Sequence, residues 1–301
     1  MLFYTSFVFL TGFAQNVATD TSAPVVAYWR LGDKKNLTIK KTVEQTQDGK
    51  PTKSSNNTYE VSLRVIDSTK ENYTVEWIYK DGGSEIGKNP SLKDFNSLLT
   101  NLKIVYKTDE VGSFEELVNY DEIRRFLNQA IDLIVKQSKD TVGMRAVVQQ
   151  LNQVFSTREG IEQLVLRDIT LYHAVYGVEY SVHPTVTETT LPNFLGGDPW
   201  PATVSMKLAQ PQPKQNSVQV IIDQEIDQVK AAAIIKQLAQ KMAAATGKEV
   251  SEKDLPSYLM IKDHSEFDVI LSSGWIKRAY MKRLAKSDDV GKTEIYEMVL
   301  R

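Results

Sequence analysis

Alternation between apolar and polar side chains marks three early segments of this chain of 301 residues. The segments are residues 37–44, 58–65 and 73–80. Successive side chains of a β-strand point to opposite faces, so a period of two gives each strand one apolar and one solvated face. Asp48-Gly49, between the first two segments, is a hairpin-turn signal because glycine accepts a positive φ. These segments predict an antiparallel meander whose apolar face must be covered.

A helical period replaces this alternation in the middle of the chain. Ser156 followed by Glu159 is a capping-box signature, in which two side chains satisfy backbone N–H groups at a helix start. We expect a three-helix insertion over residues 120–176. Its apolar residues recur at spacings of three and four in three segments, which are residues 123–134, 144–155 and 161–165.

Alternation returns in the second half, interrupted by an alanine-rich helix over about 226–245. Strands therefore flank helices at both ends, which is typical of an α+β fold. We predict a curved antiparallel sheet, with the three-helix insertion and the later helix packed on its apolar face. The further expected strands and one short helix are residues 91–99 (helix), 102–107, 114–118, 178–182, 202–208, 218–222, 267–271, 275–285 and 296–300.

The N-terminus has the length and ending of a signal peptide. Residues 2–13 are mostly apolar, and Gly12-Phe13-Ala14 places small residues where a signal peptidase reads them, although no basic residue precedes Arg30. We expect residues 1–14 to be a signal peptide, 15–24 a mature N-terminal tail, and 25–301 a single α+β domain. A split into two domains near residue 177 is the alternative. A buried N-terminal strand or helix is the alternative to export.

Composition removes several classes of function. The chain has no cysteine, which excludes disulfides and thiolate metal sites and predicts that an exported form is not a lipoprotein. Its net charge of −2, from 36 basic and 38 acidic residues, gives no global attraction to nucleic acid. No later stretch is apolar enough to span a bilayer. We therefore expect an exported protein in the periplasm, at the cell surface or secreted, without nucleic-acid partners.

Residues 82–88, GGSEIGK, have the spacing of a phosphate-binding loop. Asn89 stands where the magnesium-binding Ser or Thr is required, and Pro90 follows it. The preceding strand alternates, whereas a phosphate-loop strand is apolar on both faces. We interpret this segment as a glycine turn and expect no cofactor.

Acidic clusters offer no clear metal site. The segment 263–268, DHSEFD, contains three carboxylates and His264, but its side chains alternate between faces of a strand. Asp223, Glu225 and Asp227 precede a helix, whose positive N-terminus favours them. No serine-hydrolase motif occurs, so we expect no catalytic residues. A hydrolase with a carboxylate pair brought together by folding is the remaining enzymatic alternative.

The apolar sheet face is the predicted binding surface. If helices seal it, its side chains are core; if the sheet is a half-open barrel, they line a pocket for an apolar small molecule or lipid. Trp200, between two prolines in the loop 191–201, is either an exposed anchor for a glycan or an envelope protein, or is tucked over the sheet edge. The candidate ligand-binding residues are Tyr59, Val61, Leu63, Tyr73, Val75, Trp77 and Trp200.

Four motifs follow one another in residues 1–125: Phe13-Ala14-Gln15, Leu31-Gly32-Asp33-Lys34, YTVEWIYKD at 73–81 and YKTDEVGSFEELVNYDEI at 106–123. Their order is similar to that of exported proteins of unknown function common in Bacteroidota. The resemblance implies an envelope or secreted location and carries over no catalytic residues.

The sequence thus predicts a non-enzymatic exported envelope protein that binds an apolar ligand or a protein partner on a concave sheet face. An extracellular glycan- or protein-interaction module is the first alternative, and the carboxylate-pair hydrolase is the second.

Overall fold

A computed structural model describes residues 21–80, 102–137, 148–149, 152, 155–191, 198–209, 216–246 and 257–301. Four segments singled out above lie wholly or mostly outside these residues. They are the signal peptide 1–14, the glycine segment 82–88 with the helix 91–99, most of the helix 144–155, and most of the loop 191–201.

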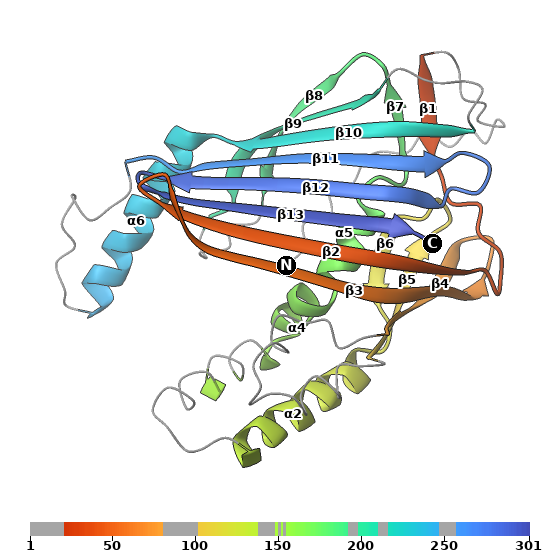
Figure 1. Ribbon diagram of the computed structural model, residues 1–301, viewed down its shortest axis with the longest axis horizontal. Coiled ribbons are helices and arrows are strands. Elements are labelled where there is room, and N and C mark those ends of the chain that lie inside the picture. The colour runs from red at the N-terminus through yellow and green to blue at the C-terminus, as the bar shows by residue number, and fades with distance from the viewer. Residues whose placement is uncertain are drawn as a thin grey trace.

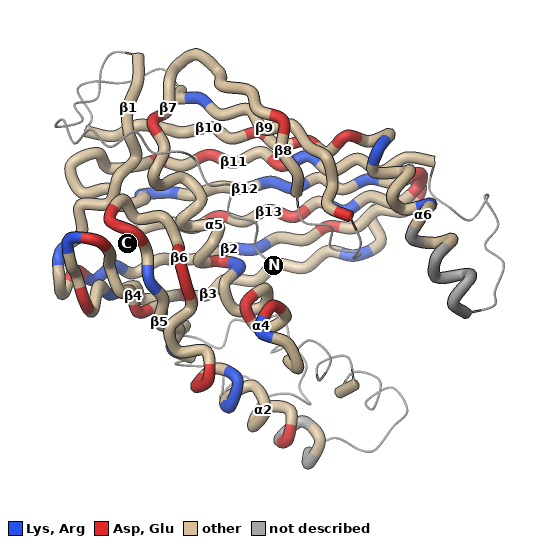
Figure 2. Tube along the Cα trace, turned by 180° about the vertical axis from the view of Figure 1, so that it is seen from behind, with Lys and Arg blue, Asp and Glu red and all other residues tan. Residues whose placement is uncertain are grey.

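Eleven strands form one antiparallel sheet, in the order β6-β5-β4-β3-β2-β13-β12-β11-β10-β9-β8 (Figure 1). The prediction of a large antiparallel sheet is confirmed, and the sheet is not closed. It curves, so that β8 and β9 on one side and β5 and β6 on the other lie on the same side of its middle strands (Figures 1 and 2). The strands are β2 (Lys34–Gln47), β3 (Lys50–Ser68), β4 (Asn72–Tyr79), β5 (Lys103–Asp109), β6 (Phe114–Leu117), β8 (Thr185–Leu191), β9 (Trp200–Leu208), β10 (Ser217–Ile226), β11 (Met260–Ile270), β12 (Ile276–Ser287) and β13 (Val290–Leu300).

A strand from the first part of the chain and the last strand of the chain pair in the centre of this sheet. Strand β13, the last in the chain, pairs antiparallel with β2, with Met298 opposite Ile39 and Leu300 opposite Leu37. The hairpin predicted at Asp48-Gly49 joins β2 to β3, and both turn residues have a positive φ. The early alternating segments therefore form internal strands of the sheet, each hydrogen-bonded to a neighbouring strand on both sides.

A second, two-stranded sheet lies where the sequence predicted a tail. Strand β1 (Ser22–Val25) pairs with β7 (Val178–Ser181), and it includes the last three residues of the expected tail 15–24. Ala23 and Val25 are buried, because alternate side chains of this short strand enter the core. Ala23 thus serves packing rather than solvation.

The described helices are α2 (Tyr120–Gln137), α4 (Arg158–Val165), α5 (Arg167–His173) and α6 (Gln228–Thr246). The capping prediction was wrong by one residue: Thr157, not Ser156, is the N-cap of α4, and its Oγ1 accepts a hydrogen bond from the N–H of Gly160 at 3.0 Å. The predicted third helix is divided at Leu166, which is both the C-cap of α4 and the N-cap of α5.

Helix α5 packs on the apolar side chains of β3, β4 and β5. The ring of Tyr172 lies 6.0 Å from that of Trp77, and the hydroxyl of Tyr59 donates to the carboxylate of Asp168 at 2.7 Å. These contacts belong to one large cluster of buried residues, which we call the first apolar cluster. Its inward-facing members on the sheet include Leu37, Ile39, Tyr59, Val61, Leu63, Val65, Val75, Trp77, Ile104, Tyr106, Val220, Phe267, Ala279 and Met298.

His173 is buried within this cluster as a neutral residue. Its Nε2 lies 2.8 Å from the hydroxyl of Tyr106, and its Nδ1 lies 2.7 Å from the carbonyl oxygen of Gly112. Because the carbonyl can only accept, Nδ1 carries the proton and Nε2 accepts from Tyr106. Burial lowers the pKa of His173 to about 4, although the hydrogen bond to Gly112 opposes this shift.

This histidine is expected to make folding sensitive to mild acid. Unfolding raises its pKa from about 4 towards 6.5, so its contribution is present above pH 6.5 and falls as the pH drops towards 4. Between about pH 7 and pH 5 the loss should be about 2 kcal/mol. Urea unfolding at both pH values should therefore show that the parent protein loses about 2 kcal/mol more than His173→Gln does. Equal losses in the two proteins would contradict a buried neutral His173.

Candidate functional site

The inward sheet face changes from apolar to charged along its central strands. On β2, the inward positions Leu37 and Ile39 are followed by Lys41. The register places Lys41 opposite Tyr296, and Arg283 opposite both Glu294 and Asp263. We use the name charged band for these charged residues and Tyr296, together with Lys292 of β13 and Arg167 of α5. Its members are Lys41, Arg167, Asp263, Arg283, Lys292, Glu294 and Tyr296.

Apolar clusters lie on both sides of the charged band. On β11, Phe267 belongs to the first apolar cluster and Ile261 to a second one, with Ser265 and Asp263 between them on the same face. On β10, Ile222 and Ile226 flank Gln224 in the same way. The second apolar cluster is formed with Ala231 of α6 and consists of Trp200, Ala202, Ile226, Ala231, Leu259 and Ile261. The charges thus occupy a strip between two apolar regions of one face.

The two carboxylates of the charged band are buried and bound by cations. Arg283 donates to both oxygens of Asp263, through Nε at 2.7 Å and Nη2 at 2.6 Å. Glu294 pairs with Nη2 of Arg167 at 2.8 Å and with Nζ of Lys292 at 2.7 Å. Since Arg167 belongs to α5, this carboxylate also joins the helix to β13.

The ring of Tyr296 supports two cations of the charged band. Its centroid lies 5.4 Å from Nζ of Lys41 and 4.8 Å from Cζ of Arg167, while the residue itself is only 2% exposed. Cation–π attraction at this range favours a fixed position for both head groups.

The cations are much more exposed than the carboxylates. The side chains of Asp263 and Glu294 are 5% and 8% exposed, whereas those of Arg283, Arg167 and Lys292 are 38%, 45% and 45% exposed. Burial opposes ionisation of Glu294, but the hydrogen bond from Lys292 and the charges of Arg167, Lys292 and Lys41 outweigh it and lower its pKa. The solvent-facing side of the charged band is therefore cationic.

The predicted ligand-binding residues on the meander are core residues. Tyr59, Val61, Leu63, Val75 and Trp77 all belong to the first apolar cluster beneath α5. Tyr73 is partly buried against the same cluster, and its hydroxyl lies 3.3 Å from the carbonyl oxygen of Ala27. The structure brings these residues together in the packed first apolar cluster, with Tyr73 partly buried against it.

Trp200 is the first residue of β9 and is 1% exposed. It contributes to the second apolar cluster, where Ala231 of α6 is also buried. Of the two interpretations of Trp200, the tucked ring therefore describes this structure and the exposed anchor does not. The flanking prolines do not prevent strand formation here, since Pro201 pairs with Thr190 of the edge strand β8.

Asp168 is a buried carboxylate beside the charged band. Its Oδ2 accepts from the hydroxyls of Tyr59 at 2.7 Å and Tyr79 at 3.0 Å. Burial raises the pKa of Asp168, while the two phenols and the charges of Arg167 and Lys41 act in the opposite direction. This carboxylate is used to join α5 to β3 and β4.

The segment DHSEFD divides between the two faces of β11. Asp263 points inward to Arg283, whereas His264 points outward, with Nδ1 2.7 Å from Asp223 and Nε2 3.2 Å from Glu266. Within the residues that the structure describes, no three His, Asp or Glu side chains are arranged to hold a metal ion.

The charged band gives no support to the hydrolase alternative. A glycosidase-like pair needs one carboxylic acid with a raised pKa to donate a proton. Asp263 and Glu294 instead lie on opposite sides of Arg283, and each accepts charge-assisted hydrogen bonds from cations. The lowered pKa of Glu294 keeps it ionised.

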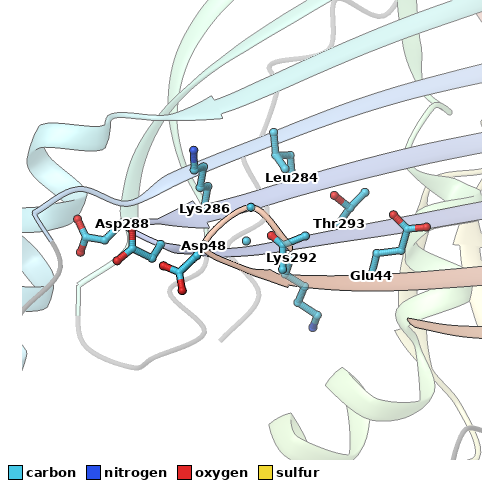
Figure 3. Close-up of a pocket in the computed structure, with 11 residues that line it drawn as sticks. Glu44, Asp48, Leu284, Lys286, Asp288, Lys292 and Thr293 are labelled. Atoms are coloured by element: carbon cyan, nitrogen blue, oxygen red, sulfur yellow. The ribbon is translucent and has the colours of Figure 1, made fainter. Parts of the chain in front are cut away.

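A separate depression of about 330 Å³ lies at the tips of the β2–β3 and β12–β13 hairpins (Figure 3). Its strand residues Thr46, Leu284 and Thr293 belong to the outward face, opposite the charged band. Its charges are mixed, with Glu44, Asp48, Asp288 and Asp289 beside Lys286 and Lys292, the last of which also belongs to the charged band. Asp288 also accepts hydrogen bonds from Ser257. The depression is therefore explained by hairpin packing.

Sequence inspection missed the charged band because its residues are far apart in the chain. The available signal was charge at inward positions of alternating strands, such as Lys41 after Leu37 and Ile39.

None of the helices in the described parts of the chain has the length and apolar character needed to cross a bilayer.

No protein-family model and no curated protein matches this chain. Among solved structures, it is similar to lipovitellin, in a structure concerned with lipid–protein interactions, at 7% identity and a TM-score of 0.42, covering 90% of this chain and 25% of lipovitellin. It is also similar to a Bacteroides fragilis protein described as exported and YmcC-like in fold, at 10% identity and a TM-score of 0.21, covering 93% of this chain and 100% of that one. The chain thus spans a quarter of lipovitellin, and neither likeness identifies a family or a function.

Proposed function

We propose that this is a non-enzymatic exported protein that binds an apolar or amphiphilic ligand on the inward face of its sheet, at the charged band. The observation that carries the proposal is the partly exposed charged strip between two apolar clusters. Placing charges on a face that is otherwise core costs stability, and hydrophobic side chains of similar size would pack there at least as well. Such charges are often retained for a function.

The partly exposed apolar residues of this strip supply the remaining surface. Met281 lies on β12 between Ala279 and Arg283 on the inward face, and Val43 is half-buried on β2 opposite Glu294. Methionine adapts to ligands of varied shape because its side chain is unbranched and polarizable. A ligand with an apolar chain would cover these side chains.

Binding should be tested with the purified full chain and a fluorescent long-chain fatty acid as the probe. Met281→Trp is expected to fill the strip and weaken binding about tenfold or more. The larger side chain would block contact between the ligand and the neighbouring charged and apolar groups. Tyr280→Trp, on the outward face of the same strand, is the matched control and should leave binding unchanged. Absence of saturable binding by the parent protein would sink the proposal, as would equal affinity of both variants.

Export and domain organisation belong to the same proposal. Residues 1–14 would be a signal peptide, and residues 25–301 one domain, an interpretation supported by the pairing of β13 with β2. Intact-mass measurement of the protein secreted from its host should show cleavage after Ala14. Retention of Met1 in the exported protein would contradict the signal-peptide assignment.

A further inference from the structure

Resting on the proposed function, we infer that the ligand carries an anionic oxygen group, a carboxylate or a phosphate, which the cations of the charged band bind.

Charge balance is the first argument. The band contains four cations, Lys41, Arg167, Arg283 and Lys292, against two carboxylates, Asp263 and Glu294. Asp168, buried beside the band, is a third carboxylate, and its charge interacts with Arg167 and Lys41. The carboxylates are buried while Arg167, Arg283 and Lys292 are partly exposed, so an approaching ligand meets the cations first, and an anionic group would interact favourably with them.

Donor geometry is the second argument. In contacts among the described residues, Arg167 donates to Glu294 through Nη2, and Arg283 donates to Asp263 through Nε and Nη2. A guanidinium has five N–H donors, so both arginines keep donors that these pairs do not use. The planar fork of arginine matches the oxygens of a carboxylate or phosphate.

Preorganisation is the third argument. Asp263 holds Arg283 by two hydrogen bonds, and Glu294 holds Arg167 and Lys292 together. Tyr296 lies against the head groups of Arg167 and Lys41. Because these side chains are already ordered, an arriving anion loses less free energy in fixing them.

Neighbouring lysines on β2 provide a matched test. Lys41 points inward to Tyr296, whereas Lys40 is exposed on the outward face. Calorimetric titration at about pH 8 would compare oleate, methyl oleate and inorganic phosphate as probes. Lys41→Gln and Arg167→Gln are each expected to weaken oleate binding about tenfold, while Lys40→Gln should not. Methyl oleate should bind weakly and equally to all four proteins.

Each outcome separates the inference from the proposed function. If oleate and methyl oleate bind equally and Lys41→Gln changes neither, the inference is overturned while ligand binding on this face stands. If neither oleate nor methyl oleate binds, both the inference and the proposed function fail. If inorganic phosphate by itself displaces oleate, and binds Lys41→Gln more weakly than the parent protein, the anion site is supported with a free oxyanion as its source. Thermal unfolding checks that the variants fold, and Lys41→Gln still decides the matter should Arg167→Gln not fold.

Discussion

Replacing Trp77 by alanine is expected to lower the free energy of unfolding by about 4 kcal/mol. Trp77 is fully buried on β4, between α5 and the sheet, where its ring lies 6.0 Å from Tyr172 and 6.4 Å from Tyr79. Removal of the indole would leave a cavity beside the buried ring of Tyr172 and the ring of Tyr79, whose hydroxyl is bound to Asp168, so the site cannot collapse fully. Urea unfolding followed by circular dichroism measures this loss.

The neighbouring residue gives the control for this prediction. Ile78 lies on the opposite face of β4 and is only partly buried. Ile78→Ala should therefore cost about 1 kcal/mol, because a half-exposed side chain loses less apolar contact. A similar cost for both substitutions would show that β4 does not have one dry and one solvated face.

Gly274→Val is expected to destabilise the protein by about 4 kcal/mol, through backbone strain and overpacking together. Gly274 has a φ of +70°, and a Cβ at this position would lie 2.2 Å from the carbonyl oxygen of Val26 and 2.8 Å from Cα of Ala27. The segment after β1 therefore crosses directly over this glycine. Its neighbour Trp275 stacks on Trp29 at 4.7 Å, so displacement of the backbone would also disturb the core.

Gly32 separates the two causes of this effect. Its φ is +87°, yet no heavy atom lies within 4 Å of the position of its Cβ. Gly32→Val should therefore show only the conformational strain, about 2 kcal/mol. Thermal unfolding of the two variants should rank Gly274→Val as clearly less stable; equal values would mean that the close approach at Val26 does not contribute.

Local patterns were sufficient to predict the strands of the early meander, but not β1, which was expected to be a tail, or β8, for which no strand was expected. The alternation of Leu37 and Ile39, and of Tyr59, Val61 and Leu63, is a local property that reports which side chains face the core. The Asp48-Gly49 turn likewise depends only on neighbouring residues. Such features can be predicted from the sequence because the same residues determine both the strand and its inward face.

Contacts between residues far apart in the chain could not be predicted from local sequence patterns. The contact between Arg283 and Asp263 requires the register of β11 and β12, and that between Arg167 and Glu294 requires α5 to lie against β13. The burial of Trp200 depends in the same way on α6, which follows it by some thirty residues in the chain. Local sequence does not encode these distances, so the charged band emerges only in the fold.

The most direct test of the inward face uses the absence of native cysteine. Single cysteines placed at Ile39, Lys40 and Lys41 on β2 would be labelled with a maleimide in the native state. We expect fast labelling at position 40, slower but measurable labelling at 41, and labelling at 39 only on unfolding, since Ile39 is 0% exposed. Fast native labelling at 39, or protection at 41 as complete as at 39, would contradict an inward face that is sealed at one end and accessible at the charged band.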